Sequence, residues 1–82
     1  MTNRSELGVL AIQHVVADAS PGAWRDAIVV ACMPGSLQLA PLDGGSLVVS
    51  TAAEAALGEP VAFHPVAEIL SAHGERARAR AV

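Results

Sequence analysis

The chain lacks most of the residues from which active sites are built. It contains one cysteine, one tryptophan and one phenylalanine, and it has no tyrosine or lysine. A single cysteine excludes an internal disulfide and any cluster of cysteine ligands for a metal ion. No Gly-x-Ser-x-Gly or Cys-x-x-Cys motif occurs, and Gly44-Gly45 is not followed by the Lys-Ser/Thr of a phosphate-binding loop. The sequence therefore predicts no catalytic residue, no cofactor and no metal site.

The chain also lacks a long apolar run and an excess of positive charge. No stretch approaches the roughly 18–20 apolar residues of a membrane-spanning helix. The apolar stretch 7–12 is too short for a secretory signal, so we expect a cytoplasmic protein that does not associate with membranes. The net charge of −3 argues against binding to nucleic acid, which requires neutralisation of phosphates.

Small apolar residues are what the chain has in abundance. Its 82 residues are 52% hydrophobic, and we expect one domain over 1–82, with residues 1–6 frayed. So short a chain buries a smaller share of its surface than a larger domain does. Because association buries additional apolar surface, this composition predicts a homo-oligomer or a module that docks on a partner protein.

The clearest structural signal is a hairpin at residues 36–50, where two apolar runs flank Asp43-Gly44-Gly45. A three-residue loop, with Gly45 in the left-handed conformation, aligns the apolar residues of the two runs on one face. A two-residue loop would put the apolar residues of the first run on the opposite face, so burial favours the three-residue loop. The predicted inward residues are Leu37, Leu39, Leu47 and Val49.

Further elements are predicted on either side of this hairpin. Residues 7–16, 24–33 and 60–64 are rich in β-branched and apolar residues and are expected to be strands. Cys32 lies in the apolar run of the second of these and is expected to be buried. The spacing of Thr51 and Glu54, followed by Gly58, predicts one short helix near 51–57. Together these elements predict a mainly β fold: a small antiparallel meander closing toward a barrel or roll.

The last segment allows two interpretations. As a hairpin that turns at His73-Gly74, it places Leu70 on the face of the small residues of the tail, and the arginines on the other face. As a helix over 65–73, it aligns Val66, Ile69 and Leu70, and the fold becomes α+β. We favour the hairpin and keep the helix as the alternative.

Three residues are candidates for ligand or partner contacts because of their chemistry. Trp24 follows a Pro-Gly turn, where it could lie in the core or at a subunit interface. His14 is expected to be a half-buried strand residue with a hydrogen-bond partner, and His64 to lie at a strand exit before Pro65, although either could line a pocket or act as a general base. His64 and Glu68 have helical i, i+4 spacing, but two side chains do not make a metal site.

The C-terminal tail carries the strongest charge pattern. Residues 75–82 hold three arginines and one glutamate, whereas residues 1–74 hold two arginines and seven acids. In a strand, alternation with alanine projects Arg76, Arg78 and Arg80 from one face, about 7 Å apart. Such a row could bind carboxylates of a partner, or phosphates. It could equally be a solvated strand whose charges prevent aggregation.

These observations favour a non-catalytic β-domain that acts as a protein-interaction or self-assembling module. The alternative is an accessory protein that binds a small molecule in the barrel mouth or between subunits, near Trp24, His14 and His64. A small enzyme with a histidine general base at a subunit interface is the third and weakest interpretation.

Overall fold

The computed structural model describes residues 6–82, and the side chains from residue 8 onward. The expected fraying of residues 1–6 falls almost entirely outside the described residues. The elements in chain order are β1 (Glu6–Leu7), α1 (Ala11–Ala19), the 3-10 turn η1 (Pro21–Ala23), β2 (Arg25–Met33), β3 (Ser36–Pro41), β4 (Leu47–Thr51), β5 (Pro60–His64), β6 (Ile69–Ala72) and β7 (Glu75–Ala81).

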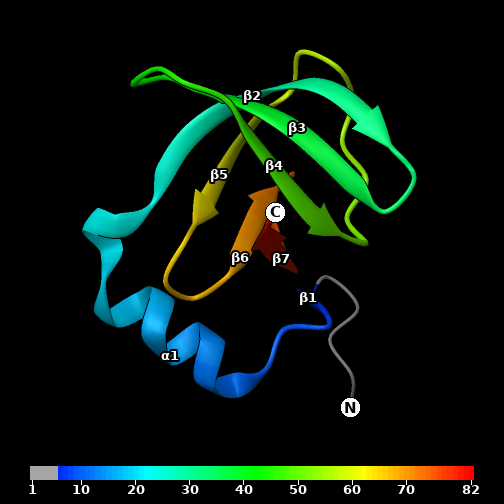
Figure 1. Ribbon diagram of the computed structural model, residues 1–82. Helices are drawn as coiled ribbons and strands as arrows, with labels where there is room; N and C mark the ends of the chain where they lie inside the picture. The colour runs from blue at the N-terminus through cyan, green and yellow to red at the C-terminus, as the bar shows by residue number, and fades with distance from the viewer. Residues whose placement is uncertain (1–5) are drawn as a thin grey trace.

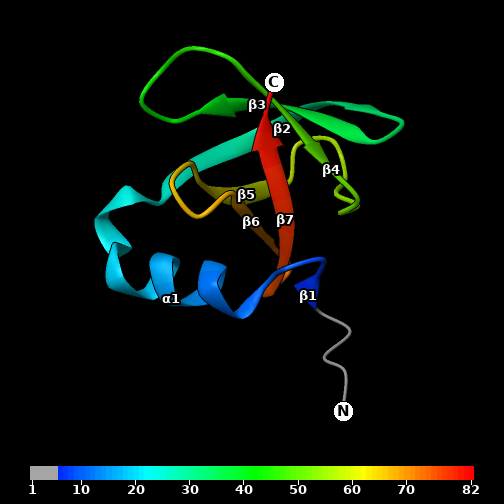
Figure 2. The same cartoon turned by 60° about the horizontal axis from the view of Figure 1, so that its bottom comes forward.

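Six antiparallel strands, β2 to β7, close into a small barrel (Figure 1). Two three-stranded meanders, β2-β3-β4 and β5-β6-β7, are joined by the pairs β2–β5 and β4–β7. The short β1 pairs in parallel with the start of β7, beyond the point where β4 leaves it (Figure 2). The predicted mainly β fold with a meander closing toward a barrel is therefore confirmed.

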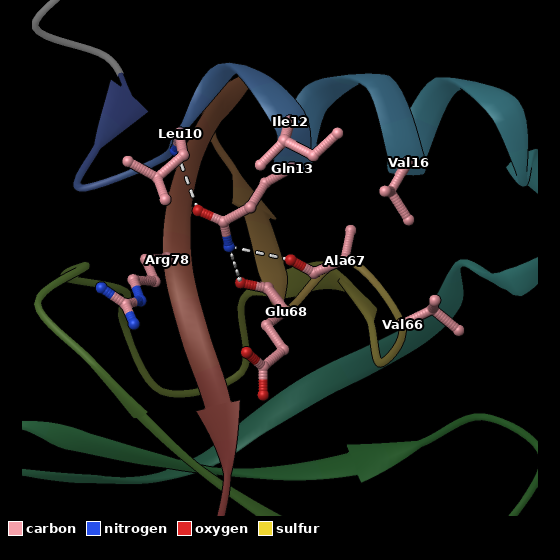
Figure 3. Close-up of a pocket in the computed structure, with 8 residues that line it drawn as sticks. All are labelled: Leu10, Ile12, Gln13, Val16, Val66, Ala67, Glu68 and Arg78. Carbon is pink, nitrogen blue, oxygen red and sulfur yellow. Dashed lines mark hydrogen bonds between the residues drawn. The ribbon is translucent and has the colours of Figure 1, made fainter.

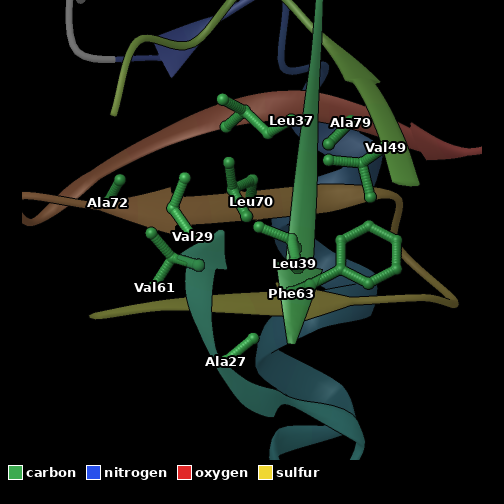
Figure 4. Packing of buried hydrophobic residues seen from close by; sticks show 10 residues of the cluster. All are labelled: Ala27, Val29, Leu37, Leu39, Val49, Val61, Phe63, Leu70, Ala72 and Ala79. Carbon is green, nitrogen blue, oxygen red and sulfur yellow. The ribbon is translucent and has the colours of Figure 1, made fainter. Parts of the chain in front are cut away.

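The barrel interior is filled mainly by valines, leucines and alanines, with Phe63 as its one aromatic ring (Figure 4). These residues alternate along the strands with outward-facing ones, as the two-residue period of a strand requires. The interior cluster consists of Ala27, Val29, Leu37, Leu39, Val49, Val61, Phe63, Leu70, Ala72 and Ala79. A second, smaller cluster packs the buried Ala17 of α1 against Ala67 and Ile69 at one end of the barrel.

The central hairpin has the predicted inward face but a longer loop. Leu39 lies opposite Leu47, so residues 40–46 connect the last pair, and the predicted three-residue loop is wrong. Residues 40–42 are held by β2 instead: Ala40 and Pro41 pair with it, and the Leu42 amide donates to the Asp26 carbonyl at 2.9 Å. The three-residue loop would pair Leu39 with Val49, so the observed pairing with Leu47 differs by two residues. Because this difference is even, the apolar residues stay on the predicted inward face.

The segment predicted as a first strand is helical from Ala11 to Ala19, so the prediction of a strand over 7–16 is wrong there. Gly8 has a φ of +70°, which turns the chain out of β1. The Leu10 amide then donates to the Gln13 side-chain oxygen at 2.8 Å, which satisfies one of the unpaired donors at the helix start. Tertiary contacts thus outweigh the β preference of the valines in this segment.

The helix predicted near 51–57 is absent: residues 52–59 form an irregular connection along β2. Its backbone bonds to a neighbouring strand instead of to itself. The Gly58 amide donates to the Val29 carbonyl at 2.8 Å, and the Val29 amide donates to the Glu59 carbonyl at 3.0 Å. The Thr51 hydroxyl accepts from the Ala53 amide and donates to the Arg78 carbonyl at 2.8 Å, which fastens β4 to β7.

The last segment is a hairpin, β6 and β7, and the alternative helix over 65–73 is wrong. The turn lies at His73 and Gly74, which have φ values of +56° and +75°. Two consecutive positive φ angles match the twist of paired strands, which explains why two residues suffice here. As predicted, Leu70 shares the inward face with the small residues of the tail, and the arginines face outward.

Candidate interaction surface

The amphipathicity of α1 is inverted relative to an ordinary surface helix. Its exposed positions are Ala11, Ile12, Val15, Asp18 and Ala19, and Ile12 and Val15 are 62% and 60% exposed. The polar Gln13 and His14 are half-buried and bond to the barrel. A helix of a monomeric protein normally turns its polar residues to solvent. We name the four exposed apolar residues, Ala11, Ile12, Val15 and Ala19, the α1 outer face.

Gln13 ties the start of α1 to the turn between β5 and β6 (Figure 3). Its amide nitrogen donates to the carbonyls of Ala67 and Glu68, at 2.8 and 3.2 Å. Glu68 adopts a φ of +57°, an uncommon conformation for a residue with a side chain. Since the amide oxygen caps the helix start, both polar ends of Gln13 serve to position α1.

Arg76 connects the second polar residue of α1 to the barrel. Its guanidinium donates to His14 Nδ1 at 2.9 Å and pairs with Asp18 at 3.2 Å. The same guanidinium lies over the ring of Trp24, 5.5 Å from its centroid. A half-buried arginine shared by a ring, an imidazole and a carboxylate holds these three groups in place.

His64 is fully buried beneath Trp24, and both of its ring nitrogens are engaged. The two rings meet edge to face with centroids 5.0 Å apart. Nδ1 accepts from the Ala67 amide at 3.0 Å, and Nε2 lies 2.9 Å from the Ser20 carbonyl. Because a carbonyl can only accept, these partners require a neutral imidazole with its hydrogen on Nε2. His64 therefore links the end of α1 to the β5–β6 turn.

The structure brings together four of the six predicted site residues and separates the other two. Trp24, His14, His64 and Arg76 form one cluster between α1 and the barrel end, where packing and hydrogen bonds account for their positions. Their role in binding stays a prediction. Arg78 and Arg80 lie farther along β7, both exposed, and Arg80 Nε is 3.6 Å from a Glu68 carboxylate oxygen.

A shallow groove runs between α1 and the β5–β6 turn, with a volume of about 220 Å³ (Figure 3). One side is apolar, and there Val66 is 67% exposed beside α1. The other side carries the charged side chains of Glu68 and Arg78. The apolar side of the groove extends the α1 outer face, so together they form a continuous exposed apolar surface.

Sequence reasoning missed this surface because it assigned the segment to a strand. The signal was present: Ala11, Val15 and Ala19 are four residues apart, which is the spacing of one ridge on a helix. The polar Gln13 and His14 would have been expected on the solvent side of such a helix. Only their partners, which are brought close by the barrel, show that they point inward.

Cys32 is exposed, so the prediction that it is buried is wrong. The pairing of β2 with β3 shifts between Val29 and Ala31, and this bulge turns the end of β2 away from the barrel interior. The thiol lies 3.1 Å from the Ala55 carbonyl.

Elsewhere at the surface, the Arg25 guanidinium donates a hydrogen bond to the Asp43 carboxylate at 2.8 Å, and this hydrogen bond lowers the pKa of the Asp43 carboxyl group.

Within the described residues, no group of three histidine, cysteine, aspartate or glutamate side chains is arranged to hold a metal ion. In the same part of the chain, no helix has the length and apolar character to cross a membrane.

Comparisons with family models, curated proteins and solved structures find no significant match to this chain.

Proposed function

We propose that this chain is a self-assembling module that forms a two-fold symmetric dimer through the α1 outer face. The inverted amphipathicity of α1 carries this proposal. Four of its five exposed positions are apolar, the fifth being Asp18, while the half-buried Gln13 and His14 bond to the barrel. Exposed contiguous apolar surface on a small soluble domain is typical of an interface.

The charge of this surface favours a second copy over a partner selected by charge. Asp18 is the one charged residue of α1; it is exposed beside the α1 outer face and is paired with Arg76. The pairing reduces like-charge repulsion between two copies, and a strongly charged partner would find no opposite charge on the α1 outer face itself. In a two-fold contact the same patch serves both subunits, so an apolar patch is complementary to itself.

The shape of the α1 outer face also suits helix-to-helix contact. Ala11, Val15 and Ala19 form a ridge at four-residue spacing, with the smallest side chains at its two ends. Such ridges pack into each other's grooves when two helices cross at about −50°. Val15 is the centre of the ridge, so the two-fold axis passes closest to this residue.

A stable dimer of so small a chain must bury a large share of its surface. A stable interface of standard size takes about 800 Å² from each partner. This is roughly one sixth of the 4840 Å² that the chain exposes. The α1 outer face alone is short, so Leu10 and Val66, which are both exposed and flank α1 at the groove, belong to the same contact.

Cysteine cross-linking tests this arrangement. In a Cys32→Ser background, Val15→Cys places one thiol from each subunit close to the axis, within disulfide reach. Mild oxidation is expected to give a covalent dimer on a non-reducing gel in high yield at micromolar protein.

Val30→Cys in the same background is the matched control, because Val30 is also an exposed valine but lies on β2. It is expected to cross-link only slowly, by random collision. Equal rates for the two variants would contradict a contact through α1.

A further inference from the structure

We infer that a second site, a cleft between β1 and β4 on the outside of β7, binds a small phosphorylated molecule through Arg78 and Arg80. The cleft has a volume of about 650 Å³. This volume lies in the range of about 300–1,000 Å³ that is typical of small-molecule sites. It shares no residue with the α1 outer face, although Arg78 also lines the charged side of the neighbouring groove.

The cleft exists because β7 changes its neighbour along its length. β1 pairs with Arg76 and Ala77, while β4 pairs with residues 79–81, so Arg78 lies at the junction of the two. Gly8 leads the chain away from β7 with a φ of +70°, and a Cβ there would come within 3.6 Å of the Arg78 Cβ. That distance is an ordinary van der Waals contact, so it is the positive φ that favours glycine at this edge of the cleft.

The backbone that presents the arginines is held on both sides. The buried Thr51 donates its hydroxyl to the Arg78 carbonyl at 2.8 Å. The Ala79 amide donates to the Glu68 carbonyl at 2.9 Å. Arg78 and Arg80 are two residues apart on one strand, so both side chains leave the same face, about 7 Å apart at their origins.

The charge at the cleft is incompletely neutralised. Among the side chains of residues 8–82, no carboxylate lies within 4 Å of the Arg78 guanidinium, and Arg80 has only the Glu68 oxygen at 3.6 Å. Ser50 lies directly opposite Arg80 across the β4–β7 pair and is exposed on the same face. Two guanidinium groups and a hydroxyl therefore line one side of the cleft.

This combination matches a phosphate monoester better than a single carboxylate. The monoester carries a charge of about −1.5 to −2 at neutral pH, which two arginines can balance. Each guanidinium can also donate two parallel hydrogen bonds to phosphate oxygens. The remaining lining residues, Gly8, Gly35, Thr51 and Ala52, are small and leave room for the organic part of the ligand.

A titration followed by amide chemical shifts tests the site, with inorganic phosphate as the probe and the ionic strength held constant. We expect saturable shifts confined to residues 50–52 and 78–80. Arg78→Gln and Arg80→Gln should each weaken binding by about tenfold or more, because each removes a charge-assisted contact. Acetate at the same concentrations should give much smaller shifts.

Arg25→Gln is the matched control, since Arg25 is a surface arginine that pairs with Asp43 away from the cleft. It should bind phosphate like the wild type. Shifts that fail to saturate would overturn the inference, as would equal binding of acetate, or equal losses in all three variants. Because Arg78 and Arg80 are exposed, their variants should keep the dispersed spectrum of the folded protein.

Discussion

Replacing Val15 by glutamate is expected to convert the dimer into a monomer. The substitution places two carboxylates against each other near the two-fold axis, where the interface excludes water. Like charges brought together in this way cost several kcal/mol. Dissociation should become at least about a hundredfold more favourable, which light scattering after size-exclusion chromatography would report as a fall in mass.

The fold itself should survive the Val15→Glu change. Val15 is 60% exposed in the protomer and belongs to neither cluster of buried residues. Surface substitutions of this kind usually alter the free energy of unfolding by no more than about 0.5 kcal/mol. Val30→Glu introduces the same charge on β2 and should leave the mass unchanged. A Val15→Glu protein that stays as large as the wild type would show that α1 is not the interface.

Replacing His64 by alanine is expected to lower the free energy of unfolding by about 3 kcal/mol. The change leaves the Ser20 carbonyl and the Ala67 amide without their partners, and each unsatisfied group costs about 1–3 kcal/mol. It also opens a cavity beneath Trp24. A chain of this size has only about 4–12 kcal/mol of stability, so the effect would be large. Urea denaturation at one fixed protein concentration measures it.

Two further variants separate the hydrogen bonds from the loss of volume. His64→Asn keeps an acceptor near the position of Nδ1, so it should retain part of the stability that alanine loses. His73→Ala is the matched histidine control, since His73 is exposed and its Nε2 lies 2.6 Å from a carboxylate oxygen of Glu59. It should lower stability by less than His64→Ala, because it removes one contact and opens no buried cavity. If His64→Ala were as stable as His73→Ala, the packing role of His64 would be refuted.

The strands that could be predicted from the sequence are those in which the residue pattern of the segment itself shows which side chains are buried. Alternating apolar residues identified β3 and β4, and a β-branched run identified β2. The short apolar stretch Pro60–His64 identified β5. The arginine–alanine alternation of the tail and the His73-Gly74 turn indicated the β6–β7 hairpin. In each case the pattern is set by the two faces of a single strand.

The elements that could not be predicted are those whose conformation depends on hydrogen bonds to residues far away in the sequence. The strand assignment over 7–16 followed β preference, but Gln13 bonds to residues 54 and 55 positions away in the sequence. The helix assignment near 51–57 followed a capping pattern, but Thr51 bonds to Arg78 instead. Neither partner can be identified from one sequence, because spacing along the chain says nothing about contacts across the barrel.

The sequence indicated which residues have binding chemistry but not which of them lie together, and their role in binding stays a prediction. Tryptophan, histidine and arginine were singled out for their chemistry, and four of these residues do meet. Their meeting place is a cluster that fastens α1 to the barrel, and His64 has both nitrogens engaged there. The apolar surface that supports the proposed function is on the opposite side of α1. It follows from which side of the helix the barrel occupies, which requires the three-dimensional structure.

The mass of the wild-type protein in solution tests the proposed self-assembly most directly. Sedimentation equilibrium over about 1–100 μM covers the affinities of most modest homodimers. The α1 interface predicts twice the chain mass of 8.3 kDa at the upper concentrations, with dissociation on dilution if binding is weak. A mass of 8.3 kDa at every concentration would contradict it.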